Sequence, residues 1–149
     1  MREIVSFNHI TLLIDQSLIE SSPGLKESID KKLTNFNFNY TIIPVPALAN
    51  NILSSITDGT DAVYLMFLKV LESNELNNLL NGLIERKIPS FSSFGIRDIE
   101  KGVTIAEFPE DFFLQRIRRI ALNIQRILIG DDPDEIPVSF MGSKRLTIN

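Results

Sequence analysis

The sequence predicts an α/β fold, namely a Rossmann-like, three-layer α/β/α domain with a mainly parallel sheet of five or six strands. Short apolar runs alternate along the chain with stretches whose apolar residues recur at helical spacing. The connections between them are short, which favours right-handed crossovers and parallel strands. A length of 149 residues suits one domain with a core of ordinary size.

The first half of the chain is expected to form three strands and two helices. The strands are the runs ITLLI, YTIIPV and DAVYLMF, at residues 10–14, 40–45 and 61–67. Ser22 is expected to cap the first helix, with Pro23 in its first turn. A short helix over residues 48–56 follows the second strand and ends at the turn TDGTD.

The second half continues the alternation. A helix capped by Ser73 has apolar residues at positions 76, 79, 80, 83 and 84. Two further strands, IPSFS and VTIAEF, are expected at residues 88–92 and 103–108, separated by a helical turn that ends at Gly102. The longest helix follows and stops at Gly130, and an extended segment near residues 137–140 comes last. Together the helices are expected to cover both faces of the sheet.

Composition excludes several classes of function. A net charge of −4 argues against general attraction to nucleic acid, so no nucleic-acid partner is expected. The absence of cysteine removes disulfides, thiolate nucleophiles and cysteine metal sites. No run of 18 apolar residues spans a membrane, and the start of the chain lacks a signal-peptide cleavage site. The basic residues of the longest helix are interpreted as a solvated face; they are Arg116, Arg118, Arg119 and Arg126.

No catalytic, cofactor or metal motif is visible. The turn after the first strand, DQSLIESSPG, has a single glycine and cannot supply the dinucleotide pattern G-x-G-x-x-G. The only histidine, His9, precedes the first strand, at the wrong end of the sheet for a hydrolase site. The acids of the turn after the longest helix lack calcium-loop spacing and are interpreted as solvated; they are Asp131, Asp132, Asp134 and Glu135. The sequence therefore predicts a protein that is not an enzyme and carries no cofactor or metal.

Several stretches together resemble the ABC transporter substrate-binding protein family of the type I periplasmic-binding-protein fold. They are TLLIDQSLIESSPGLKESI (11–29), DAVYL (61–65), LLNGLIERKIPSFSSFG (79–95), EKG (100–102), RIALNIQRILIGDDPDEIPV (119–138) and LTIN (146–149). Members of this family close two Rossmann-like lobes over a small solute. The resemblance implies that residues 1–149 are a single lobe, the C-terminal one, of a longer two-lobe protein whose N-terminal lobe is missing here. It also implies a periplasmic or membrane-anchored extracytoplasmic location and an ABC permease as partner.

The ligand is expected at the carboxyl ends of the parallel strands, because open α/β sheets bind ligands there. The candidate ligand-binding residues are Asp15, Gln16, Ser17, Phe67, Ser92, Ser93, Phe94 and Glu110. Asp15 and Ser93 are expected to make hydrogen bonds, and Phe94 either stacks on the ligand or packs under the turn that follows it. Where relatives carry polar or acidic residues, this chain has Phe94 and the run 65–68 (LMFL), so the solute is amino-acid-like or more apolar.

A second hypothesis stays open at this point. The apolar side chains of Met66, Phe67 and Phe94 suit contact with a protein, so the chain is alternatively an interaction or scaffolding protein of an envelope or efflux complex. An isolated lobe would also expose the surface that its companion lobe faces, and this predicts a homodimer.

Overall fold

The computed structural model describes residues 4–46, 52–66, 68, 71–93, 96–107, 112–137 and 146–149. Its six-stranded sheet has the order β2-β1-β3-β4-β5-β6. The strands are β1 (His9–Asp15), β2 (Asn39–Val45), β3 (Ala62–Met66), β4 (Ser90–Ser92), β5 (Ile105–Ala106) and β6 (Thr147–Ile148). The first five strands are parallel, and β6 pairs antiparallel with β5. The predicted fold class, a three-layer α/β domain with a mainly parallel sheet, is confirmed.

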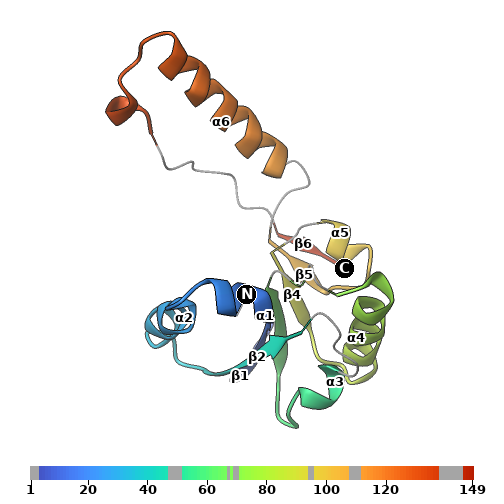
Figure 1. Cartoon of the computed structure of the whole chain (residues 1–149). Helices are drawn as coiled ribbons and strands as arrows, with labels where there is room; N and C mark the ends of the chain where they lie inside the picture. The colour runs from blue at the N-terminus through green and yellow to red at the C-terminus, as the bar shows by residue number, and fades with distance from the viewer. Residues whose placement is uncertain are drawn as a thin grey trace.

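Helices cover both faces of the sheet (Figure 1). On one side lie α1 (Gln16–Ser21) and α2 (Leu25–Leu33), and on the other lie α3 (Ile52–Ser55), α4 (Ser73–Glu85) and α5 (Ile96–Ile99). Alternate residues of β1 and β3 point to opposite faces, so each face has its own core. Leu13, Val63 and Leu65 join the core beneath α3 and α4, whereas Ile14 and Ala62 join the core beneath α1 and α2.

Two helix starts differ from the prediction. The first helix begins at Gln16, directly after β1, because the Asp15 side chain accepts the backbone N–H of Ser17 and caps α1. Ser22 therefore ends α1 instead of capping a helix, and α2 starts only after Gly24, whose φ of 86° breaks the helical path.

The start of α4 is the second correction. Ser73 is the first residue of the helix, and the N-cap position belongs to Glu72, whose side chain makes no capping hydrogen bond. Serine is a preferred N-cap residue, but here the extended backbone of Glu72 occupies the N-cap position and Ser73 follows it inside the helix.

Two predicted strand segments also change. Among the described residues the fifth strand covers β5 alone, and Glu107 extends its ladder through a backbone N–H bond of 3.1 Å to Ser92 O. Residue 108 of the predicted strand lies outside the described residues. The last strand is β6 and lies later in the chain than predicted. Of the predicted extended segment, residues 138–140 lie outside the described residues, as do residues 48–51 of the predicted third helix.

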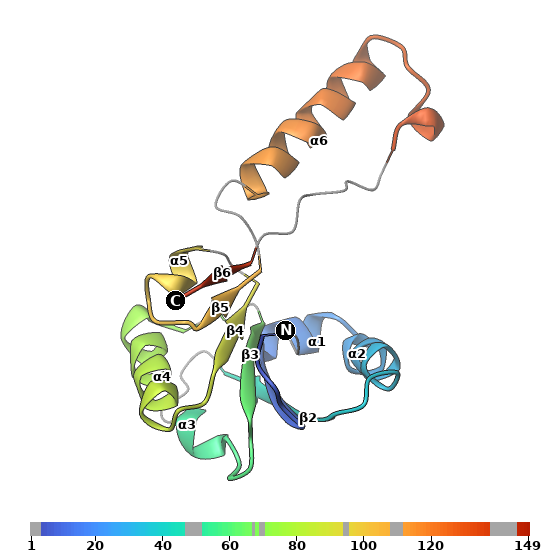
Figure 2. The ribbon, with the colours of Figure 1, turned by 180° about the vertical axis from the view of Figure 1, so that it is seen from behind.

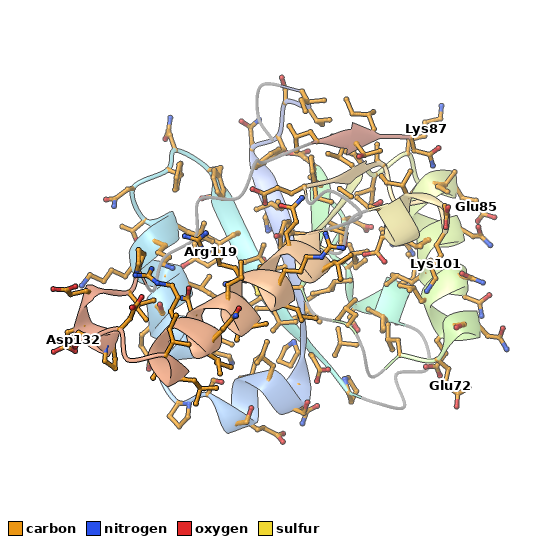
Figure 3. All side chains as sticks on the ribbon, turned by 90° about the horizontal axis from the view of Figure 1, so that it is seen from above. Glu72, Glu85, Lys87, Lys101, Arg119 and Asp132 are labelled. Carbon is orange, nitrogen blue, oxygen red and sulfur yellow. The ribbon has the colours of Figure 1, made fainter. Side chains whose placement is uncertain are left out.

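The long helix α6 (Phe112–Leu128) stands apart from both layers. In Figures 1 and 2 it projects beyond one edge of the sheet, and in the view from above (Figure 3) it passes across the front of the domain. The segment after it folds back on the helix, since Asn123 Nδ2 donates to Pro137 O at 3.3 Å and Arg126 pairs with Asp131 at 2.6 Å. Within the described part of the chain, no helix combines the length and apolarity that crossing a membrane requires.

Candidate functional site

The carboxyl ends of β1 to β5 meet at one edge of the sheet, on the side from which α6 projects (Figures 1 and 2). The strand order reverses between β1 and β3, so the residues after these two strands flank the topological switch point. In open α/β sheets this crevice is where ligands bind. We refer to this region as the carboxyl edge.

Asp15 lies at the switch point and stabilises α1. Its side chain is 6% exposed, and its Oδ1 accepts both the Ser17 N–H at 2.9 Å and the Ser17 hydroxyl at 2.7 Å. Gln16 points along the helix and donates from Nε2 to Glu20 Oε1 at 2.6 Å. Of the three predicted residues at this position, Ser17 is the exposed one.

Ser92 lies inside the fold. Its side chain is 1% exposed and donates a hydrogen bond from Oγ to the carboxylate of Asp98 in α5. This contact ties the end of β4 to the helix below it. Ser92 and Asp15 are therefore both at the carboxyl edge, but each carries an internal hydrogen bond that supports the fold.

Three other polar residues belong to the opposite face of the sheet at the same edge. Tyr64 of β3, Ser93 and Glu107 are all half-buried. Burial raises the pKa of Tyr64, the Ser93 hydrogen bond opposes this, and the nearby carboxylate of Glu107 raises the pKa further. Tyr64 is therefore a neutral hydroxyl beside a negative charge. We refer to Tyr64, Ser93 and Glu107 as the tyrosine cluster.

Sequence reasoning found Ser93 but missed Tyr64 and Glu107. A signal for them exists in the alternation of the strands, because Tyr64 and Phe91 are register partners and so are Phe91 and Ile105. Residues two positions beyond Phe91 and Ile105 return to the same face, and these are Ser93 and Glu107. Phe67, Phe94 and Glu110, which were also predicted to line the site, lie outside the described residues.

The opposite, amino edge of the sheet holds a cavity of about 340 Å³ lined by Ser6, Phe7, Asn8 and Asp61. The carboxylate of Asp61 accepts the backbone N–H groups of Asn8 at 2.8 Å and His9 at 3.0 Å, and these two bonds lower its pKa. His9 itself bonds the Thr41 hydroxyl at 2.8 Å, at the amino end of β1 as predicted. These contacts fasten the N-terminal segment to the sheet and do not reach the carboxyl edge.

The acidic turn after α6 is organised by its own contacts. Asp132 caps the 3-10 helix η1 (Pro133–Glu135) by accepting the Asp134 N–H at 3.0 Å, and Asp131 pairs with Arg126. Within the described ranges, no group of three or more histidine, aspartate or glutamate side chains is placed to hold a metal ion.

No protein-family model matches this chain, and no curated protein matches it. Among solved structures, the chain is similar to the ligand-free, open structure of CD0873, a substrate binding protein with adhesive properties from Clostridium difficile. The TM-score is 0.71 at 16% sequence identity, and the match covers 99% of this chain and 50% of that chain. The chain thus spans about half the length of CD0873, and over that half it has the fold of a substrate-binding protein.

Proposed function

We propose that residues 1–149 form one lobe of a two-lobe, non-catalytic substrate-binding protein, which holds a small solute between its lobes. The observation that carries this proposal is the solvent-exposed apolar face of α6. The similarity to half of CD0873 supports it, because a protein of twice this length has room for a companion lobe.

Within the described residues, the apolar face of α6 is left exposed and is not covered by other apolar side chains. Its isoleucines recur at helical spacing and are well exposed, with Ile117 at 63%, Ile120 at 49% and Ile124 at 53%. Each such side chain contributes about 1.5–3 kcal/mol when fully buried, so covering this face is strongly favourable. We define the α6 face as Leu114, Ile117, Ile120, Ile124, Ile127 and Leu128.

The sheet is a poor candidate to cover the α6 face, because helices already close both of its sides. Leu80 and Leu83 of α4 are each 1% exposed, and Ile29 of α2 is 9% exposed. A companion lobe that covers the α6 face would stand beyond the carboxyl edge, because that is where α6 stands (Figure 1). Its docking would turn the open edge into one wall of a cleft.

Solute binding then follows from the position of this wall. Ser17 and Ser93, together with Asp15 behind them, would meet the solute from this lobe, and closure of the two lobes would report occupancy to a partner. A protein of this kind hands its solute to an ABC permease outside the cytoplasm. Catalysis has no part in this proposal.

Isothermal titration on the full-length protein, guided by a thermal-shift screen of small solutes, tests the proposal. We expect a solute that raises the melting temperature, and we expect the double substitution Asp15→Ala, Ser93→Ala to weaken its binding at least tenfold. A full-length protein that binds no solute in the screen would refute the proposed function. Unchanged affinity in the double variant would refute only the assignment of these two residues.

The alternative role, as a scaffolding protein, draws on the same α6 face, since a folded protein partner would cover it equally well. A pull-down from native membranes separates the two roles. We expect a permease to be retained, with retention that depends on added solute. An efflux or envelope component retained regardless of solute would favour the alternative.

A further inference from the structure

We propose that the amino edge of the sheet carries a separate binding site, which takes a neutral saccharide. The site combines the exposed ring of Phe36 with the cavity of about 340 Å³ that is lined by Ser6, Phe7, Asn8 and Asp61. We refer to it as the amino-edge site. It lies at the opposite end of the parallel strands from the carboxyl edge, so it goes beyond the proposed function and does not depend on it.

Aromatic rings form a continuous row from the surface into the core at this edge. Phe36, in the turn between α2 and β2, is 58% exposed. Its ring stacks on Phe38, with the centroids 5.9 Å apart and an angle of 27° between the planes. Phe38 meets Phe7 edge-on at 5.3 Å, and Phe7 meets the buried Phe91 at 6.3 Å. Because the inner rings are packed, Phe36 rests on a firm support and offers an apolar surface to solvent.

The cavity supplies hydrogen-bonding groups whose capacity is not used up. Asp61 accepts the N–H groups of Asn8 and His9 through Oδ2 alone, at 2.8 and 3.0 Å, so it closes the edge of the sheet with one oxygen and keeps Oδ1 as an acceptor. Ser6 and Asn8 are exposed, and among the described residues their side chains make no hydrogen bond to protein atoms. A serine hydroxyl and an asparagine amide can each donate and accept.

The cavity and the aromatic row adjoin because β1 and β2 are paired. Phe7 belongs to both features. At the start of the pairing, the backbone N–H of Asn39 donates to Asn8 O at 2.7 Å. This bond holds the turn that carries Phe36 and Phe38 beside the rim of the cavity. An apolar platform therefore stands next to a set of donors and acceptors.

A saccharide matches this combination, since the C–H face of its ring is apolar and its hydroxyls both donate and accept. The C–H face would stack on Phe36, and hydroxyls of the next ring would reach Asn8 and Asp61 Oδ1, where a hydroxyl bonds strongly to a charged acceptor. A cation fits less well, because the two backbone N–H groups already stabilise the Asp61 carboxylate without a counter-ion. The expected ligand is thus a disaccharide or a longer chain.

Saturation-transfer NMR on the full-length protein tests the class of ligand. The probes are the neutral disaccharides maltose, cellobiose and N,N′-diacetylchitobiose, with sorbitol as a polyol that has no ring face and cadaverine as a cation. We expect at least one disaccharide to bind with a millimolar dissociation constant, and sorbitol and cadaverine to bind at least tenfold more weakly. No binding of any disaccharide, or cadaverine as the tightest ligand, would overturn the inference.

Substitutions then locate the site. Phe36→Ala should weaken disaccharide binding by about 10-fold, and Asn8→Ala by about 3- to 10-fold, because the first removes the stacking surface and the second a hydrogen bond. Phe36→Tyr should retain binding, since the ring is kept. The matched controls are Leu122→Ala, at a leucine of α6 that is 52% exposed beyond the carboxyl edge (Figure 1), and Asn78→Ala, at an exposed asparagine of α4. Both controls should leave the affinity unchanged.

The outcomes distinguish this inference from the proposed function. Amide chemical-shift changes on addition of the disaccharide should gather at residues 6–8, 36–38 and 61. If they gather at the carboxyl edge instead, or if Phe36→Ala and Asn8→Ala behave like their controls, the amino-edge site is wrong and the solute-binding lobe stands. A failed screen for solutes of the carboxyl edge would refute the proposed function and leave this site intact, because the two lie at opposite ends of the strands.

Discussion

Helices α4 and α6 both carry apolar side chains at helical spacing, yet their surroundings are opposite. In α4, Leu79, Leu80 and Leu83 are 3%, 1% and 1% exposed. In α6, Ile117 and Ile124 are 63% and 53% exposed. The pattern of an amphipathic helix indicates which face is to be buried. It does not indicate which surface will cover that face. In this molecule α4 has the sheet, and the α6 face has no counterpart among the described residues.

The largest expected effect is a truncation in the buried helix. Leu80→Ala should lower the free energy of unfolding by about 2–5 kcal/mol, because it removes buried methyl groups and leaves a cavity in a packed core. Urea unfolding followed by circular dichroism measures this loss. The paired substitution Ile124→Ala in α6 should change stability by less than about 0.5 kcal/mol. Equal losses for the two variants would mean that α6 packs on its own domain in solution.

The exposed helix should instead control association. We expect the 149-residue chain alone to form dimers or weak oligomers through the α6 face, as the sequence predicts for an isolated lobe. Replacing Ile117, Ile120 and Ile124 with serine should raise the dissociation constant by about 100-fold, because most of the buried apolar area is lost. Sedimentation velocity over a range of concentrations measures it. A wild-type chain that stays monomeric at high concentration would contradict this expectation.

A short helix sharpens the contrast with α6. Helix α5 has only four residues and is nevertheless held against the sheet, since Asp98 accepts a hydrogen bond from the buried Ser92. Ser92→Ala should cost about 1–3 kcal/mol of stability, because the Asp98 carboxylate loses a partner in a poorly solvated place. Ser55→Ala, at an exposed serine of α3, is the control and should be neutral within about 0.5 kcal/mol. Equal effects would show that the Ser92 contact contributes nothing.

The sequence supported the sheet better than the site. Continuous apolar runs such as residues 10–14 define buried parallel strands, and β1 extends that run by one residue at each end. Side-chain partners are a different matter, because a capping preference is local and several residues compete for it. Asp15, and not Ser22, caps the first helix, because it stands where β1 ends and its carboxylate reaches the Ser17 N–H in the first turn. The position of Asp15 after a strand predicts a ligand contact, whereas its role as a helix cap is visible only in the structure.

The tyrosine cluster shows the same limit from another side. Its members come from three strands, and only the register between those strands reveals that Tyr64, Ser93 and Glu107 share a face. The sequence order of the strands does not contain this register, because β4 and β5 are too short to show a period of their own. The partner of the α6 face is likewise not predictable from the residue pattern of α6 alone.

The two edges of the sheet give the last and smallest expected effect. The carboxyl edge is proposed to face a companion lobe, whereas the amino edge is closed internally by Asp61, which accepts two backbone N–H groups. These bonds place the pKa of Asp61 in the folded protein below its ordinary value of 3.8. A lowered pKa means that the carboxylate stabilises the fold above pH 3.8 and that this contribution is lost as the pH falls through the lowered value.

Asp61→Asn should therefore be slightly less stable than wild type at neutral pH, and the difference should shrink as the pH falls below 3.8. Urea unfolding at a series of pH values measures it, with Asp58→Asn in the exposed turn before β3 as the control. A difference that grows on acidification would mean that Asp61 does not fasten the N-terminal segment through its charge.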